Sequence, residues 1–189
     1  MFRPESKDCE YIRHVFPEID AIQDPKLREQ VIEAWIEAWR SSKYPRIEDA
    51  VFSTQMPHIK LKDHVSGVAK MALGIANVLE ETHGLHVNKD HVIAGALLHD
   101  IDKIMMLEKR GENYGVAENL SKFPHGYVGA RLANKIGLPR DIEHLILSHT
   151  TKQIISPKTI EAIIVHYADY ADFDALAFTS GKRLLLQKS

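Results

Sequence analysis

One short segment, in which an apolar run leads directly into charge, constrains the fold of this chain most. The run from Val92 to Leu98 lies in a predicted helix over about residues 88–104 and is followed by His99-Asp100-Ile101-Asp102-Lys103. An ionised Asp100 among apolar neighbours costs free energy unless it is paired with a cation or coordinated to a metal. The segment therefore predicts a buried helix whose end carries a polar site.

Apolar residues recur at helical spacing along most of the chain. Besides the segment above, this spacing predicts helices at about residues 25–39, 64–83, 125–136, 139–148 and 156–171. No segment alternates strictly between apolar and polar residues, as a half-buried strand would. We therefore expect an all-α fold, a single helical bundle, with connectors at 41–57 and 105–124. The second connector is long enough to act as a lid.

Charge and composition exclude several classes of partner. The formal net charge of the 189-residue chain is −2 with both signs spread along it, which disfavours duplex nucleic acid and anionic membranes. No apolar run approaches the roughly 20 residues needed to cross a bilayer. The single cysteine, Cys9, and the lack of an apolar leader favour a reducing compartment. We expect a cytoplasmic protein with a small-molecule ligand, and its oligomeric state stays open.

Six potential metal ligands lie near the ends of the predicted helices. They are His64, His99, Asp100, His125, His149 and Asp169. Imidazole and carboxylate suit divalent transition metals such as iron, manganese, cobalt or zinc, and the set contains no thiolate. We therefore predict a metal site. His166 is expected to support the site or to belong to the core rather than to bind the ion, and the other histidines are expected to be ordinary surface or core residues.

The order His…His-Asp…Asp, formed by His64, His99-Asp100 and Asp169, resembles the HD-domain superfamily of metal-dependent phosphohydrolases. The sequences Ala-Leu-Leu-His-Asp-Ile-Asp-Lys at 96–103 and Tyr-Ala-Asp at 167–169 carry the resemblance. It implies an HD-domain helical bundle. The corresponding division of the chain is an N-terminal helical extension packed on the core (1–57), the HD domain (58–172) and a C-terminal tail (173–189).

The resemblance also implies an activity. In that superfamily the four residues of the signature bind one metal, and His125 and His149 correspond to residues that hold a second. One or two divalent ions would activate water for attack on a phosphoester or phosphoanhydride. His125-Gly126, His149-Thr150 and Tyr167-Ala168-Asp169 look most like the subgroup that hydrolyses diadenosine tetraphosphate symmetrically. A small phosphorylated substrate, a nucleotide, is therefore expected.

Two residues receive catalytic roles. Asp100 is the natural bridging ligand between two ions, because a carboxylate has two oxygens. Lys103, one turn beyond His99, either meets a substrate phosphate or is a solvated cation at the helix end. Asp102 is expected to be an exposed partner of a lysine rather than a residue that supports the metal ligands or transfers a proton. Two alternatives remain: a di-iron HD-type oxygenase, which uses a similar His/Asp set, and a non-catalytic nucleotide-sensing HD domain.

Overall fold

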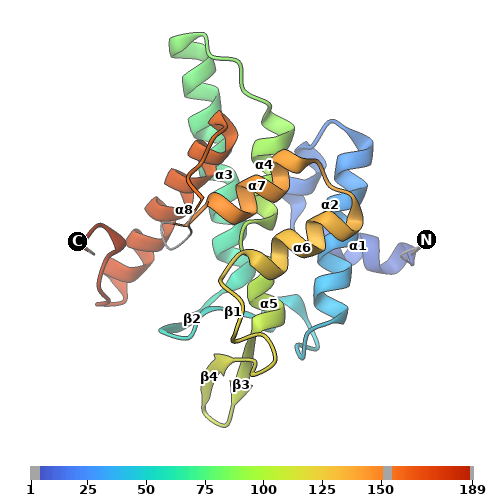
Figure 1. Ribbon diagram of the computed structural model, residues 1–189, viewed down its shortest axis with the longest axis vertical. Helices are drawn as coiled ribbons and strands as arrows, with labels where there is room; N and C mark the ends of the chain where they lie inside the picture. Colours follow the sequence, from blue (N-terminus) through green and yellow to red (C-terminus); the bar gives the residue numbers. More distant parts are fainter. Residues whose placement is uncertain (1–4, 151–154, 188–189) are drawn as a thin grey trace.

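The computed structural model describes residues 5–150 and 155–187, most of which are helical (Figure 1). The helices are α1 (Ser6–Val15), α2 (Pro25–Arg40), α3 (Leu61–His83), α4 (Lys89–Leu98), α5 (Asp102–Met106), α6 (Tyr127–Ile136), α7 (Arg140–Ser148) and α8 (Ile160–Thr179). Two antiparallel hairpins are formed by β1 (Val51–Ser53) with β2 (Met56–Lys60) and by β3 (Leu107–Arg110) with β4 (Asn113–Val116). The predicted helical bundle with a helical N-terminal extension is confirmed.

Helix α4 lies in the middle of the bundle and packs against α2, α3, α7 and α8 (Figure 1). Every residue from Val92 to Leu98 is buried, so this part of the helix presents no polar face. Gly95 allows α7 to approach closely, because a Cβ at this position would lie 2.3 Å from Leu145 Cδ1. The central position of α4 places the residues that follow its last turn inside the protein.

The N-terminal helices cover one side of α4. Asp24 caps α2 by accepting hydrogen bonds from the backbone amides of Lys26 and Leu27, and Pro25 occupies the first turn. Trp35 is fully buried, with its ring centroid 4.3 Å from that of Phe16. Its indole Nε1 donates a hydrogen bond to Leu97 O at 3.1 Å. The extension therefore holds the last turn of α4, immediately before the His-Asp pair.

The structure corrects the prediction of one helix from 88 to 104. Helix α4 ends at Leu98 and α5 begins at Asp102. The backbone between them stays close to helical, but the amide of Ile101 donates to Leu98 O and that of Lys103 to Asp100 O, three residues back. This tighter turn changes the direction of the side chains after His99. Among the described residues, no helix is long and apolar enough to cross a membrane.

Both predicted connectors contain a hairpin, which the sequence analysis did not foresee. In the second, Gly111 has φ +62° and opens the two-residue loop between Arg110 and Asn113. Helix α8 is longer than the predicted helix at 156–171 and runs to Thr179, so the segment called the tail begins inside it. Residues 1–4 of the extension and 188–189 of the tail lie outside the described part.

Candidate metal centre

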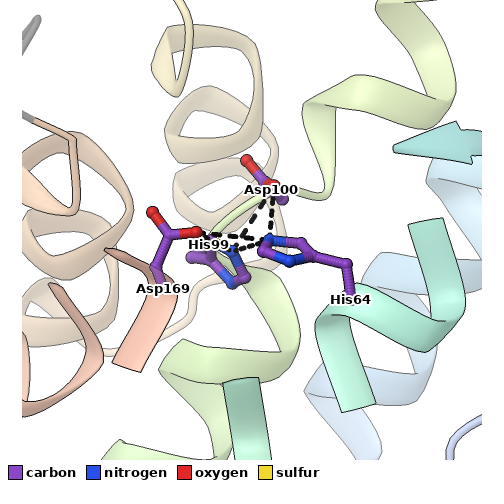
Figure 2. Close-up of side chains that lie close together, drawn as sticks. All are labelled: His64, His99, Asp100 and Asp169. Atoms are coloured by element: carbon purple, nitrogen blue, oxygen red, sulfur yellow. Dashed lines mark hydrogen bonds and ion pairs between the residues drawn. The ribbon is translucent and has the colours of Figure 1, made fainter. Parts of the chain in front are cut away.

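Four of the predicted ligands converge from three parts of the fold. His64 lies in the first turn of α3, His99 and Asp100 follow α4, and Asp169 lies on α8; Figure 2 shows their side chains pointing toward one another. His64 Nε2 lies 3.1 Å from His99 Nε2, 3.1 Å from Asp100 Oδ2 and 3.2 Å from Asp169 Oδ1. Nitrogen and oxygen donors therefore surround one point, and we call these four residues the first cluster.

A second cluster shares Asp100 with the first. His125 precedes α6 and His149 follows α7, and their Nε2 atoms lie 3.1 Å apart. Asp100 Oδ1 lies 2.9 Å from His125 Nε2 and 3.6 Å from His149 Nε2, whereas Oδ2 of the same carboxylate faces the first cluster. Asp100 is thus placed between two groups of donors.

The structure brings together all six residues selected from the sequence. Within each cluster the potential ligand atoms lie within 4.8 Å of one another. Five of the six residues are buried, and the exception is His125, whose side chain is 29% exposed. His125 is therefore the most exposed member of the two clusters.

Each of the four imidazoles has an oxygen atom beside its Nδ1, the ring nitrogen that points away from the clusters. His99 Nδ1 and His149 Nδ1 lie 2.7 Å from the carbonyl oxygens of Ala96 and Ile146, three residues earlier in each chain segment. His64 Nδ1 lies 2.6 Å from Asp172 Oδ2, and His125 Nδ1 lies 3.2 Å from Asp102 Oδ2. In the neutral rings this arrangement places the proton on Nδ1 and leaves each Nε2 lone pair facing its cluster.

These donors fit divalent metal ions. Within each cluster two Nε2 atoms face each other at 3.1 Å, an arrangement that a shared cation stabilises. Among the described residues, the buried Asp100 Oδ1 has no partner with good hydrogen-bond geometry, although His125 Nε2 lies 2.9 Å from it. A buried carboxylate oxygen in this position gains from coordination. The two clusters are consistent with a binuclear site built from imidazole and carboxylate.

Mutual charge shifts the pKa values of the groups in the site. Burial lowers the pKa of His64, but hydrogen bonding to Asp100 and two further carboxylates outweighs burial and raises it to about 10. The pKa values of His99 and His125 are raised to about 9 against burial, chiefly by the charges of Asp100 and Asp102 respectively. The pKa of Asp169 is lowered, since its hydrogen bonds to His64 and His99 outweigh burial. Without an ion, protons supply the positive charge that the carboxylates require.

Neither Lys103 nor Asp102 has the solvent-exposed surroundings that are usual for charged residues at the end of a helix. Lys103 Nζ lies 2.5 Å from Asp100 Oδ2 and 4.0 Å from the centroid of the Phe52 ring, with the side chain 19% exposed. The expectation that Asp102 is exposed is wrong. It is fully buried, and it accepts a hydrogen bond from Gly126 N at 2.6 Å besides facing His125. The turn between α4 and α5 points it inward, a change that helical spacing does not reveal.

Two supporting residues complete the surroundings of the clusters. His166 Nδ1 lies 2.6 Å from the backbone oxygen of His149, so its ring contacts the residue that carries one of the candidate ligands. Asp172, three residues after Asp169 on α8, was not singled out from the sequence. Its spacing was the available signal, because residues three apart lie on one face of a helix.

A pocket of about 290 Å³ opens above both clusters. Asp100, His125, His149 and Asp169 form the side of the pocket that belongs to the two clusters. Its apolar wall is made by Phe52, Met106, Leu107, Val116, Phe173 and Leu185, with Tyr170 beside them. Ser53, Thr54 and Gln55 of the β1–β2 turn add polar groups. Among the described lining residues, Lys103 is the only lysine or arginine.

Comparison with known proteins adds independent findings. The sequence profile of the HD domain matches residues 61–174. Dihydroneopterin 2′,3′-cyclic phosphate phosphodiesterase of Methanocaldococcus jannaschii is 32% identical over 164 residues, which cover 81% of this chain and 65% of that protein. Ribonuclease Y of Acidothermus cellulolyticus is 35% identical over 85 residues, which cover 45% of this chain and 14% of the enzyme. The chain thus spans less than two thirds of either relative. No solved structure gives a significant match.

Proposed function

The chain belongs to the HD domain family, and from this premise we propose that it is a metal-dependent phosphohydrolase that cleaves a phosphodiester in a small molecule. The observation that carries the proposal is Asp100, whose two oxygens face two histidine-rich clusters at one side of a pocket. Two-metal sites with a shared carboxylate suit in-line displacement at phosphorus. The proposed ions are iron, manganese, cobalt or zinc, the metals that suit this donor set.

We assign the first ion to His64, His99, Asp100 and Asp169 and the second to Asp100, His125 and His149. Divalent ions held there would supply Lewis acidity toward a phosphoryl oxygen and water activated near neutral pH. Lys103 provides a fixed positive charge at the pocket wall, where it stabilises charge on the phosphate or on the leaving oxygen. Its contacts with Asp100 and Phe52 limit where its ammonium group can move.

We further propose that the substrate joins one phosphodiester to a planar ring. The apolar and aromatic wall of the pocket suits the faces of a heterocycle, and the β1–β2 turn offers hydrogen-bonding groups for its edge. The name of the archaeal relative specifies a cyclic phosphate of a pterin. Symmetrical hydrolysis of diadenosine tetraphosphate is a less favoured alternative, because four charged phosphates need more cations than the described pocket provides.

The proposed division of the chain is an extension over 1–57, an HD domain over 58–172 and a tail over 173–189. The match of the family profile to residues 61–174 supports the proposed bounds of the HD domain. The contact of Trp35 with α4 and that of Phe52 with Lys103 support a structural role for the extension.

The test is hydrolysis by metal-loaded protein, with and without oxygen, of a panel of compounds. The panel contains 2′,3′-cyclic nucleotides, a pterin cyclic phosphate, diadenosine tetraphosphate, phosphomonoesters and phosphonates. We expect oxygen-independent cleavage of a cyclic phosphate, lost on chelation and restored by manganese, iron or cobalt. Calcium should restore it poorly, because that ion prefers oxygen ligands. Turnover that requires oxygen would establish an oxygenase instead, and tight nucleotide binding without turnover would establish a sensor.

A further inference from the structure

In both clusters, one imidazole is held by a backbone carbonyl and the other by a carboxylate. Each contains one imidazole whose Nδ1 is held by a backbone carbonyl, His99 in the first and His149 in the second. Each also contains one imidazole whose Nδ1 is held by a carboxylate. The carboxylates are Asp172 for His64 and Asp102 for His125, and neither belongs to the proposed ligand set.

We propose that Asp172 and Asp102 are positioning residues, each controlling the affinity of the site for one of the two ions. A carboxylate beside Nδ1 keeps the proton on that nitrogen, orients the ring and increases electron donation from Nε2. The carbonyls that hold His99 and His149 cannot be altered by a side-chain substitution. Asp172 and Asp102 are therefore the residues at which a substitution can change the affinity of the site for one ion separately from the other. The inference rests on the proposed metal-dependent function.

The carboxylate of Asp172 packs against Gly67, a residue without a side chain. Gly67 lies on α3 three residues after His64, and a Cβ there would come within 2.9 Å of Asp172 Oδ1. That separation is too short for two such atoms, so an alanine at 67 displaces the carboxylate from its position. Gly67 thus has a steric role in the contact between α3 and α8, beside the ligand His64.

Asp102 is held equally firmly, although by a different contact. Its Oδ2 accepts the hydrogen bond of Gly126 N at 2.6 Å and faces His125 Nδ1 at 3.2 Å. One carboxylate oxygen thereby fixes both the ring of His125 and the backbone at the start of α6. This arrangement explains how His125 keeps its orientation although its side chain is 29% exposed.

The experiment measures zinc and manganese affinity by competition with a chromophoric chelator in five proteins. They are the wild type, Asp172→Asn, Gly67→Ala, Asp102→Asn and the control Gly74→Ala. Gly74 lies on the same helix, and a Cβ there meets no atom within 4 Å. Gly74→Ala should raise the thermal stability of the metal-free protein, because alanine favours a helix over glycine. Gly67→Ala alone should change metal binding.

We expect Asp172→Asn and Gly67→Ala to weaken one ion by about 10–100-fold, as loss of an outer hydrogen-bond partner does elsewhere, and to spare the other. Asp102→Asn should weaken the ion that those two variants spare. In zinc-loaded wild type labelled with ¹⁵N, the ring nitrogen spectra should show a protonated Nδ1 at His64 and at His125.

The outcomes separate this inference from the proposed function. A wild type that binds no ion overturns both. Two ions bound with unchanged affinity in Asp172→Asn and Gly67→Ala overturn the role of Asp172 and leave the proposed function intact. If Asp102→Asn does not fold, the spectrum decides for Asp102, because an unprotonated Nδ1 at His125 contradicts its role.

Discussion

The body of α4 and the residues that follow it have opposite surroundings. Around the body, α2 contributes Trp35, which packs on Phe16, and the buried side chains there are apolar. Directly after the helix, buried charge begins at His99 and Asp100. In the described part of the chain, the buried polar or charged residues are His64, His99, Asp100, Asp102, Ser148, His149 and Asp169. All of them are in the candidate site except Ser148, which directly precedes one of its histidines.

This contrast separates stability from chemistry. In the packed region, favourable free energy comes from many small contacts, none of which is needed for catalysis. In the charged region, each group is compensated by its neighbours, and few groups carry the chemistry. Substitutions in the packed region should therefore lower the free energy of unfolding and leave metal binding unchanged. Substitutions in the charged region should above all weaken metal binding.

The largest effect is expected for Asp169→Ala. This change removes a charged residue that we propose as a ligand of the first ion, and water cannot replace its affinity for an ion. Turnover should fall by more than roughly 100-fold, which is the upper value for loss of a residue that only hydrogen-bonds to a metal ligand. Metal analysis and hydrolysis rates of the folded variant check this result. Retained turnover with normal metal content would exclude Asp169 as a ligand.

The next effect concerns the number of ions. His125→Ala and His149→Ala should each lower the metal content from two ions toward one per chain, with a steep loss of activity. The first cluster does not include either ring, so its ion should remain. Metal analysis on wild type and both variants measures the difference. If the wild type and both variants contain one ion throughout, the histidines contact the substrate rather than a second ion.

In the packed region, Trp35→Ala should cost about 3–5 kcal/mol of unfolding free energy, the usual range for a buried tryptophan. It also removes the hydrogen bond to Leu97 O. Denaturant unfolding of the metal-free protein gives the free energy, and metal analysis below the unfolding transition should give the wild-type value. Loss of an ion at constant fold would show that the two regions are coupled through the end of α4.

The smallest effect is expected at Glu48, which accepts a hydrogen bond from Tyr11 at 2.5 Å and pairs with Arg46 at 2.6 Å. Burial opposes ionisation, but these contacts outweigh it and lower the pKa of Glu48 to about 2. Its stabilisation is therefore complete above the ordinary pKa of 4.5 and is lost as the pH falls toward 2.

Glu48→Gln should accordingly lower the unfolding free energy by about 1.5–3 kcal/mol at pH 7, the range for hydrogen bonds to charged groups. The difference from wild type should shrink as the pH falls below 4.5 and vanish near 2. Denaturant unfolding at a series of pH values provides the measurement. A difference that does not depend on pH would assign the effect to packing rather than to charge.

The same contrast explains which features could be predicted from the sequence. Helices α2 and α3 were predicted because each carries an apolar stripe and a recognisable end, Asp24-Pro25 or His83-Gly84. Helix α1 was missed because Ile12 and Val15 are its only buried residues and Glu5 makes no side-chain cap. The candidate ligands were found because a histidine-aspartate pair beside an apolar run is hard to explain otherwise.

Other features depend on contacts between distant parts of the chain. The inward turn of Asp102 follows from three-residue hydrogen bonds after Leu98, and no residue type in that segment specifies them. The contact between Asp172 and His64 joins α8 to α3 across 108 positions of sequence. The β3–β4 hairpin has one local signal in the sequence, Gly111, which begins its two-residue loop. It was not predicted, because its polar strands lack an alternating pattern.

The position of the β1–β2 turn has a consequence for how this scaffold can acquire new specificities. Phe52 to Gln55 line the pocket, yet they precede the stretch 61–174 that matches the HD domain profile. Leu107 and Val116, a pair at the base of the other hairpin, contribute to the same wall. Surface hairpins tolerate exchange better than the helices that carry the candidate ligands. With Phe52 kept against Lys103, exchange of the other residues of these two hairpins would let directed evolution explore new substrates at the proposed site.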